Sequence, residues 1–382
     1  MLLQAMRYGL TFLLPLMLGL ASCGASSAGD SAATAAQKAT LDRLALTDVA
    51  TFDEPWAMAF VPGTPYLLVT EREGTIRIVD AAGKVFAVEG APRVDYGGQG
   101  GLGDIAFLAG TGDSPLSPTI FLSWAEPGPG DTRGAVVGRG SLEIDEGDGT
   151  ARINGLEIIW RQQPKVSGRG HYSHRLAFSP DGQYLFVSSG DRQKMAPAQD
   201  PASDLGKIIR IPIDIAGKPT GPAERFSMGH RNVLGLAFDS EGRLWDLEHG
   251  PAGGDEINLV EQGRNYGWPL VSEGRHYSGK AIPRHATRPD LAAPAISWNP
   301  VIAPGNMVIW QGGLFPQWQG NAIIAGMAYP GLVRVELRGT TAREVERIPL
   351  GSRIREVEQG PDGALWLLED GDDGRLRRIA PK

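Results

Sequence analysis

The chain has 382 residues, 52 glycines, 28 prolines, one cysteine and a formal net charge of -7. Aliphatic and aromatic residues are dispersed throughout, which excludes a disordered protein and indicates a turn-rich fold with a large core. The acidic balance argues against a nucleic-acid partner, because phosphate binding needs a clustered positive surface.

The N-terminus resembles a bacterial lipoprotein signal. An apolar run from Leu10 to Leu20 leads into Leu20-Ala21-Ser22-Cys23, and the run is shorter than the ~20 residues that a spanning helix needs. We therefore expect a signal over residues 1–23 and a lipid on Cys23 that holds the mature chain to a membrane on the periplasmic side of the envelope. A flexible tether is expected over residues 24–44. The alternative is a membrane anchor helix with an incidental cysteine.

From residue 45 onward one pattern recurs: an alternating apolar run, a turn such as Asp-Gly, and a second apolar run. Each copy is predicted to be a β-hairpin. Six copies at irregular spacing match four-stranded blades with insertions, whereas long 3.6-residue periodicity is not found. We expect an all-β fold, a six-bladed β-propeller over residues 45–382, with ligand loops over its central channel. The copies lie at 55–80, 104–126, 174–192, 234–250, 306–337 and 355–379.

The segment GGQGGLG (97–103) matches the GxGxxG pattern through Gly98, Gly100 and Gly103. A strand is predicted after it, so no helix N-terminus is available for a pyrophosphate. A tight backbone turn is the better interpretation. Gln99 would project from this turn as an amide with two donors and one acceptor.

GRGHYSHRLAF (168–178) holds His171 and His174 just before a predicted strand. Zinc is not favoured, because there is no HExxH pattern and no third ligand at useful spacing. A histidine at such a loop edge can act as a general base, since its free pKa is near neutrality. Packed or hydrogen-bonded histidines are the alternative.

Four polar residues fall in corresponding loops of later copies. Arg231 and Asn232 combine a planar guanidinium with an amide, which suits a carboxylate or quinone oxygen. Arg353 and Arg355 are two residues apart and so lie on one face of a strand. Together they indicate an anionic ligand over the channel. The alternative, that the arginines pair with surface acids, stays open.

LEHGPAGGDEINLVEQGRNYGWP (247–269) is too rich in glycine and proline for a long helix. It is predicted to be a shaped loop, serving either as a strand-connecting corner or as a ligand site. Asp255 and Glu256 lie at its centre. Near the C-terminus, DGDDG (370–374) resembles a calcium loop, but no acid stands at its twelfth position, so a solvated turn is favoured.

Several segments in order resemble the soluble PQQ-dependent aldose sugar dehydrogenases of the glucose/sorbosone dehydrogenase family. The similarity runs from about Pro55 to Ile379, which is far more specific than any single motif. It implies a six-bladed propeller that binds pyrroloquinoline quinone (PQQ) over the channel with calcium touching the cofactor. The segments are GQGGLGDIAF, AQDPASDLGKIIRI, GHRN, EHGPAGGDEINLVEQGRNYGWP and SRIREVEQGPDG.

The resemblance also implies roles for individual residues. His171 aligns with the general base that removes the proton of the anomeric hydroxyl, and Arg231 stabilises charge on the quinone. Gly250 and Pro251 match carbonyl ligands of the cofactor calcium, while Glu256 and the carbonyl of Tyr266 match a second calcium site. The PQQ contacts fall on Gln99, Arg231, Asn232, Arg353 and Arg355.

The chain departs from the family pattern at several places. Gly170 stands where many relatives have Asn or Asp, and Tyr172-Ser173-His174 replaces the common Phe-Gly-Gly. Ala328 stands near the position of a cofactor-pairing lysine in some members, and residues 305–310 replace Ser-Gly-Met-Ala-Phe-Tyr. We expect weaker anchoring of the PQQ carboxylates and a different substrate wall.

The resulting hypothesis is a lipid-anchored enzyme that oxidises the C1 hydroxyl of an aldose to a lactone and passes electrons to an external acceptor. Two alternatives stay open. A calcium-dependent lactonase would use the same loops to hold a metal-activated water without a redox cofactor. A non-catalytic propeller lipoprotein would serve as a scaffold in the envelope.

Overall fold

The computed structural model describes residues 41–382 except 109 and 113. The predicted signal over residues 1–23, and the tether before residue 41, lie outside the described residues. The described part consists of strands and three short 3₁₀ helices, η1 (Ala196–Gln199), η2 (His285–Thr287) and η3 (Pro316–Trp318). No helix in this part is long and apolar enough to cross a membrane. The all-β prediction is confirmed.

The strands, numbered in chain order, are separated mainly by glycine- and proline-containing turns. They are β1 (Leu44–Phe52), β2 (Pro55–Phe60), β3 (Leu67–Glu71), β4 (Thr75–Val79), β5 (Val85–Glu89), β6 (Leu102–Phe107), β7 (Thr119–Pro127), β8 (Arg133–Asp145), β9 (Thr150–Arg161), β10 (Ser173–Phe178), β11 (Tyr184–Ser189), β12 (Lys207–Pro212), β13 (Glu224–Met228), β14 (Val233–Phe238), β15 (Leu244–Glu248), β16 (Asp255–Val260), β17 (Ile296–Trp298), β18 (Pro304–Ile309), β19 (Asn321–Gly326), β20 (Gly331–Arg338), β21 (Thr341–Pro349), β22 (Ile354–Gln359), β23 (Leu365–Glu369) and β24 (Gly374–Pro381).

These strands form four four-stranded sheets and one eight-stranded sheet. The four-stranded sheets have the orders β10-β11-β12-β13, β14-β15-β16-β17, β18-β19-β20-β21 and β1-β24-β23-β22. In the eight-stranded sheet, two antiparallel groups, β2 to β5 and β6 to β9, meet through a parallel pairing of Val88 with Ala151 and Glu89 with Arg152. Each group of consecutive strands is therefore an antiparallel meander.

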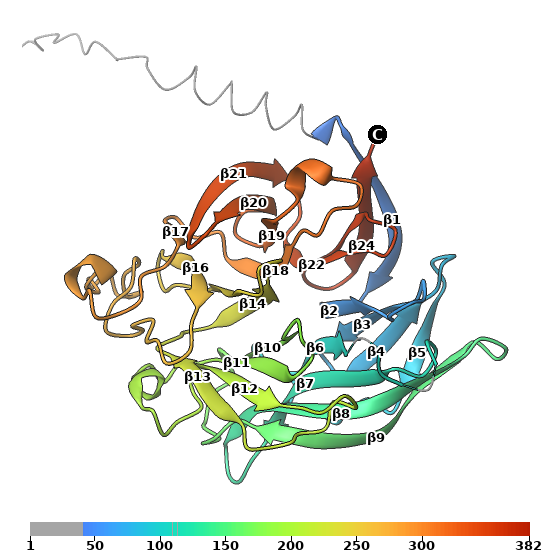
Figure 1. Ribbon diagram of the computed structural model, residues 1–382, viewed down its shortest axis with the longest axis horizontal. Helices are drawn as coiled ribbons and strands as arrows, with labels where there is room; N and C mark the ends of the chain where they lie inside the picture. Colours follow the sequence, from blue (N-terminus) through green and yellow to red (C-terminus); the bar gives the residue numbers. More distant parts are fainter. Residues whose placement is uncertain (1–40, 109, 113) are drawn as a thin grey trace, which may run out of the picture.

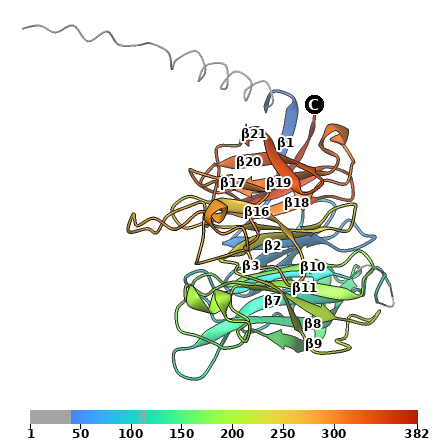
Figure 2. The same cartoon turned by 60° about the vertical axis from the view of Figure 1, so that its left-hand side comes forward.

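The sheets are arranged in a ring (Figure 1). The first strands of the groups, β2, β6, β10, β14, β18 and β22, contact one another in that order, and β22 also contacts β2. The ring is closed by the two ends of the described chain, because β1 pairs antiparallel with the C-terminal strand β24. Figure 2 shows the same sheets from the side, with β1 next to the C-terminus. Closure of this kind protects most strand edges.

All six inner hairpins carry the same irregularity. The register shifts by one residue near the amino end of each inner strand, for example between Ser173 and Leu176 in β10. The same shift occurs in the hairpins that begin with β2, β6, β14, β18 and β22. Such bulges bend a strand and re-aim side chains, and they are common near active sites. Here they all lie at the same end of the channel.

Apolar side chains of the middle strands hold neighbouring sheets together. One cluster joins the two halves of the eight-stranded sheet and includes Leu68, Ile76, Leu122 and Val136, all fully buried. Each such side chain contributes roughly 1.5–3 kcal/mol when removed from water. The apolar runs read from the sequence therefore form the core between sheets, and polar residues are left at the strand ends.

Candidate active site at the amino ends of the inner strands

A cavity of about 420 Å³ lies at the amino ends of the inner strands. Its wall includes the first residues of β2 and β10, the turn before β6 and the residues before β14, β18 and β22. Its volume is within the range of small-molecule sites. Four of the residues predicted to contact PQQ line it: Gln99, Asn232, Arg353 and Arg355.

Arg175 closes the channel below this cavity. Its guanidinium lies 4.0 Å from the ring centroid of Trp56, which lines the cavity, and donates to the carbonyls of Leu234 and Gly305. It also pairs with Asp104 and Glu356. Beyond Arg175, a second cavity of about 320 Å³ lies at the carboxyl ends of the same strands.

His171 is fixed by a buried carboxylate. Its Nδ1 lies 2.7 Å from Asp191 Oδ1, and the two residues are 7% and 0% exposed. Burial alone would raise the pKa of Asp191, but hydrogen bonds from His171, Trp268 and the Gln193 backbone outweigh it and hold this pKa below its usual range. Asp191 is therefore an anion that orients the imidazole and can stabilise its protonated form.

The backbone around His171 is unusual. His171, Ser173 and His174 all have positive φ values, of 48°, 61° and 52°. Residues with a side chain adopt this left-handed region rarely, and such positions cluster at functional sites. The Gln99 side chain stabilises this conformation, because its Oε1 accepts a hydrogen bond from the His171 backbone N–H at 2.7 Å.

Arg231 lies beside His171 in a smaller cavity of about 200 Å³, which Pro251, Trp268 and Tyr277 also line. Its Nη1 donates to the His249 carbonyl at 3.0 Å, and its Nη2 lies 3.3 Å from the Tyr277 hydroxyl. Its Nε is buried and has no hydrogen-bond partner. No ion pair joins its guanidinium to an acidic side chain in the described part of the chain, and its Nε–H remains an unsatisfied donor.

Arg353 and Arg355 converge on one carboxylate. Arg353 donates to Asp370 Oδ2 at 2.6 and 2.8 Å, and Arg355 donates to Asp370 Oδ1 at 2.7 Å. Burial opposes ionisation of Asp370, but the two guanidiniums outweigh it and lower the pKa. The interpretation of DGDDG as a solvated turn was therefore wrong for its first residue. The alternative that these arginines pair with acids is therefore correct for Arg353 and Arg355. Both guanidiniums share the single carboxylate of Asp370, so one positive charge is not neutralised.

Asn232 is positioned by Glu248. The backbone N–H groups of Arg231 and Asn232 both donate to Glu248 Oε2, at 2.6 and 3.3 Å. The Asn232 side-chain oxygen accepts from the Ser173 hydroxyl at 3.2 Å. The GHRN turn is thus held on two sides, which fixes the direction of the Arg231 guanidinium.

Asp255 shapes the glycine-proline corner. Its carboxylate accepts hydrogen bonds from the backbone N–H groups of Gly250, Ile302 and Ala303 at 2.7–2.9 Å. A side chain at position 250 could not fit, because its Cβ would lie 2.2 Å from the Gly254 carbonyl oxygen. The corner therefore fixes the Gly250 and Pro251 backbone beside Arg231. Burial raises the pKa of Asp255 to about 6.

Glu256 points to the opposite face of β16 from Asp255. It lines a cavity of about 10 Å³ together with Glu248, Tyr266 and His285. This is about the space that one water or small ion needs. Burial, followed by repulsion from Glu248, raises the pKa of Glu256 well above its usual value. A cation in this cavity would relieve both effects, so the surroundings fit the predicted calcium ligand.

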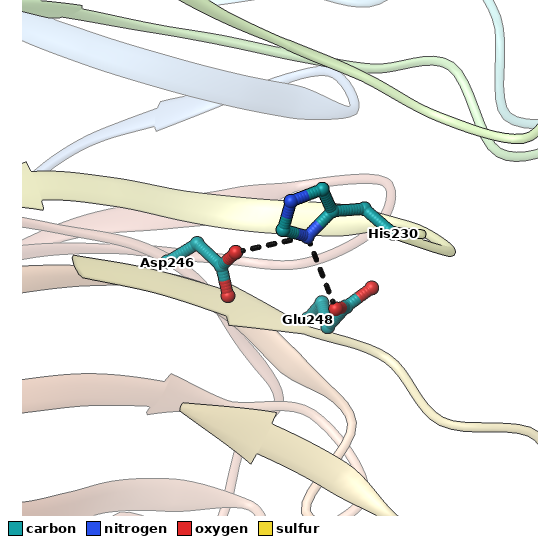
Figure 3. Close-up of side chains that lie close together, drawn as sticks. All are labelled: His230, Asp246 and Glu248. Carbon is teal, nitrogen blue, oxygen red and sulfur yellow. Dashed lines mark ion pairs between the residues drawn. The ribbon is translucent and has the colours of Figure 1, made fainter. Parts of the chain in front are cut away.

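His230, Asp246 and Glu248 form a second buried cluster (Figure 3), and Glu248 also lines the small cavity. His230 Nδ1 lies 3.1 Å from Asp246 Oδ2 and 3.4 Å from Glu248 Oε1. Burial opposes protonation of His230, but the two carboxylates outweigh it and raise its pKa to about 9. These three side chains carry donors that a divalent metal accepts. In the structure the imidazolium supplies the positive charge that the carboxylates need.

The departures from the family pattern have physical reasons. A Cβ at Gly170 would lie 2.4 Å from Gln193 Cδ, so an Asn or Asp there requires that side chain to move. His174 stacks on Trp56, and burial lowers its pKa to about 3, which keeps it neutral. Its Nδ1 lies 2.8 Å from the Ser123 hydroxyl. The alternative of a packed and hydrogen-bonded histidine therefore describes His174.

Sequence reasoning missed several residues of this site. Asp191 was overlooked although it lies two residues after the buried strand β11 in the hairpin that begins beside His171. Arg72 also lines the larger cavity and pairs with Glu54 at 2.7 Å. Nothing in its surrounding sequence distinguished it from other hairpin residues. Some family members have a cofactor-pairing lysine near position 328. In this chain Met327 lines the cavity at that place, and its Sδ lies 3.6 Å from Arg353 Nη2.

The fold and site define a class: a closed ring of β-sheets with a polar cavity at one end of its channel. A model of the glucose/sorbosone dehydrogenase family matches residues 52–378, and the chain belongs to this family. The predicted family is thereby confirmed. The family and the Escherichia coli relative are both named as sugar dehydrogenases, which supports the assignment of this chain as an oxidoreductase.

Individual relatives agree with this assignment. The chain is 35% identical over 346 residues to aldose sugar dehydrogenase YliI of Escherichia coli (strain K12), covering 86% of this chain and 91% of the relative. A crystal structure of the soluble aldose sugar dehydrogenase from Escherichia coli in the apo-form has a TM-score of 0.79 at 33% identity, over 89% and 100% of the two chains. The PQQ-bound aldose sugar dehydrogenase from Streptomyces coelicolor has a TM-score of 0.69 at 26% identity, over 89% and 98%.

Proposed function

We propose that this protein is a PQQ- and calcium-dependent dehydrogenase that oxidises the C1 hydroxyl of an aldose to a lactone. The observation that carries the proposal is the imidazole of His171, hydrogen-bonded at 2.7 Å to a buried carboxylate in a cavity that the Arg231 guanidinium also lines. A base and a site for an anionic cofactor are thus neighbours. The PQQ-bound Streptomyces relative supports the choice of cofactor.

The residues present fit the quinone. Arg231 has a buried Nε without a partner, and Asn232 is held beside it. Arg353 and Arg355 together carry one positive charge more than Asp370 neutralises, which favours a carboxylate-bearing guest. Bound PQQ, polarised by calcium, would accept the hydride from C1, and an external acceptor would reoxidise it.

The residues present also fit two calcium ions. The corner fixed by Asp255 would present the carbonyls of Gly250 and Pro251 to the cofactor calcium. Glu256 and Tyr266 both line the small cavity, where burial and repulsion from Glu248 raise the pKa of Glu256, and a bound calcium ion would relieve both effects. Hard oxygen ligands of this kind suit calcium better than a transition metal.

His171 would take the proton of the C1 hydroxyl through Nε2. Its Nδ1 faces Asp191 Oδ1 at 2.7 Å, so the donor proton sits on Nδ1 and Nε2 is left as the acceptor. When Nε2 gains the proton, the Asp191 anion stabilises the imidazolium. Arg231, beside it, offers positive charge where negative charge develops. Loss of the proton from the C1 hydroxyl oxygen and of the hydride from C1 itself leaves the lactone carbonyl.

The proposal includes the architecture and the location. Counting each antiparallel meander of the ring as one blade gives a six-bladed β-propeller. We also propose that Cys23 carries a lipid that holds the enzyme on the periplasmic side of the envelope. Replacement by C23A should then move the protein from the membrane fraction to the soluble periplasmic fraction. An unchanged distribution would contradict the anchor.

The central test adds PQQ and calcium to the purified protein. We expect a visible quinone absorption that changes when an aldose is added, and reduction of a dye acceptor. Omitting calcium or PQQ is the control. A protein that gives neither spectrum nor dye reduction, or that hydrolyses lactones without an acceptor, would contradict the proposal.

A further inference from the structure

Tyr277 is an unusually exposed aromatic residue at the mouth of the smaller cavity. Its side chain is 78% exposed, although it lines the same cavity as His171 and Arg231. Single exposed apolar residues are common, so exposure alone indicates little. The position beside the proposed base and the rigid support of its loop distinguish Tyr277.

The loop that carries Tyr277 is held by backbone hydrogen bonds. Arg275 pairs with Ala252 in both directions, at 2.9 and 3.2 Å, and the His276 N–H donates to the Lys280 carbonyl at 2.9 Å. Gly279, with φ of 86°, makes the tight turn. Because Ala252 follows the Gly250-Pro251 corner, the hairpin tip is fixed relative to the cavity and loses little entropy when a ligand binds.

The Tyr277 side chain also contacts Arg231, the residue proposed to stabilise negative charge during the reaction. Its hydroxyl lies 3.3 Å from Arg231 Nη2, and the Arg231 guanidinium lies 6.0 Å from the ring centroid. One edge of the ring is therefore engaged, while most of its surface remains open to solvent. Pyranose rings present patches of C–H groups that pack on aromatic faces, and their hydroxyls remain available for hydrogen bonds.

We propose that Tyr277 is the platform on which the apolar face of the sugar packs while the C1 hydroxyl reaches His171. The inference rests on the proposed sugar oxidation and adds a residue that sets affinity for pyranose substrates. The cavity of about 200 Å³, lined also by Met195, His276 and Trp268, bounds the size of the sugar unit. Larger saccharides would extend past the exposed hairpin tip.

The test compares Tyr277→Ala and Tyr277→Phe in the enzyme loaded with PQQ and calcium. We expect Tyr277→Ala to raise KM for aldopyranoses about tenfold with little change in kcat, because the platform acts on binding. Tyr277→Phe should have a KM close to that of the wild-type enzyme, since it keeps the aromatic ring and loses only the hydroxyl. The control is Ile215→Ala, which removes a 93% exposed side chain elsewhere and should change neither constant. An unchanged KM in Tyr277→Ala overturns the inference.

A second readout does not need turnover. In saturation-transfer NMR, the protons of the sugar ring should give signals with the wild-type protein and with Tyr277→Phe. These sugar signals should be much weaker with Tyr277→Ala. If these signals behave as expected but no quinone is reduced, the proposed oxidation fails and the sugar platform stands. If the wild-type enzyme oxidises aldoses and all variants give equal signals, the platform fails and the proposed function stands.

Discussion

The two cavities of the channel are built on the same inner strands but differ in charge. At the amino ends, Arg72, Arg353 and Arg355 outnumber the acids Glu54 and Asp370. At the carboxyl ends, carboxyl groups outnumber the single cation Arg175. Guanidiniums keep their charge when buried, whereas carboxyl groups can take up protons. Only the amino-end cavity is therefore suited to hold an anion at neutral pH.

The carboxyl groups of the carboxyl-end cavity take up protons more readily than free carboxyl groups, which lowers the negative charge of this cavity. Burial, partly offset by Arg175, raises the pKa of Glu356 to about 7, and burial together with Glu356 raises the pKa of Glu358 to about 8. The same inner strands thus carry a cavity rich in guanidiniums at one end and a cavity rich in carboxyl groups at the other. The difference comes from the side chains at the strand ends rather than from the fold.

Replacing the proposed base should give the largest effect. We expect His171→Ala to lower kcat for aldose oxidation about 10³-fold, because general base catalysis contributes roughly 10²–10⁴-fold. PQQ absorption on reconstitution should be retained. The matched control is Glu358→Gln in the other cavity, which should keep kcat within about twofold. Equal losses in both variants would remove the functional distinction between the two ends.

Removing the cation between the cavities should mainly affect stability. Arg175→Met would leave Asp104 and Glu356 buried without their partner, at a cost of about 3 kcal/mol in the free energy of unfolding. Urea unfolding followed by tryptophan fluorescence measures it. Arg243→Met, which breaks a more exposed pair with Asp239, is the control and should cost about 1 kcal/mol or less. A similar loss in both would contradict a special role for Arg175.

Asp191→Asn should separate orientation of the base from cofactor binding. The amide keeps the shape but loses the charge that stabilises the His171 imidazolium, so we expect kcat to fall about 30-fold. The dissociation constant for PQQ, measured by absorbance titration, should change little. A large loss of PQQ binding with normal kcat would show that Asp191 acts on the cofactor instead.

The smallest effect concerns pH and the acidic cavity. Because the folded pKa of Glu358 lies above its unfolded value, the folded chain binds more protons between about pH 4.5 and 8, and stability falls as pH rises through this window. Glu358→Gln should remove about 1–2 kcal/mol of this decline between pH 5 and 8. Unfolding titrations at both pH values measure it, and an equal decline in both proteins would count against the assignment.

The sequence by itself determined the all-β class, the six hairpins and the family. Alternating apolar residues around Asp-Gly turns produce hairpins through local geometry, and these hairpins appear where they were predicted. The resemblance also predicted roles for His171, Gln99, Arg231 and Asn232, and these four residues line the two cavities at the amino ends of the inner strands. Charge pairing between loops was not readable, so the shared partner Asp370 was missed.

Only the tertiary structure decided which residue lies opposite His171, the proposed base. Extending the regular register of the β10–β11 hairpin, with Phe178 opposite Leu185, would place His171 opposite Arg192. The bulge between Ser173 and Leu176 shifts the pairing by one residue and brings Asp191 to His171 instead. The bulge lies at the amino end of the inner strand, where the ring packs β10 between β6 and β14. A one-residue shift of this kind depends on packing between sheets, which local sequence patterns do not encode.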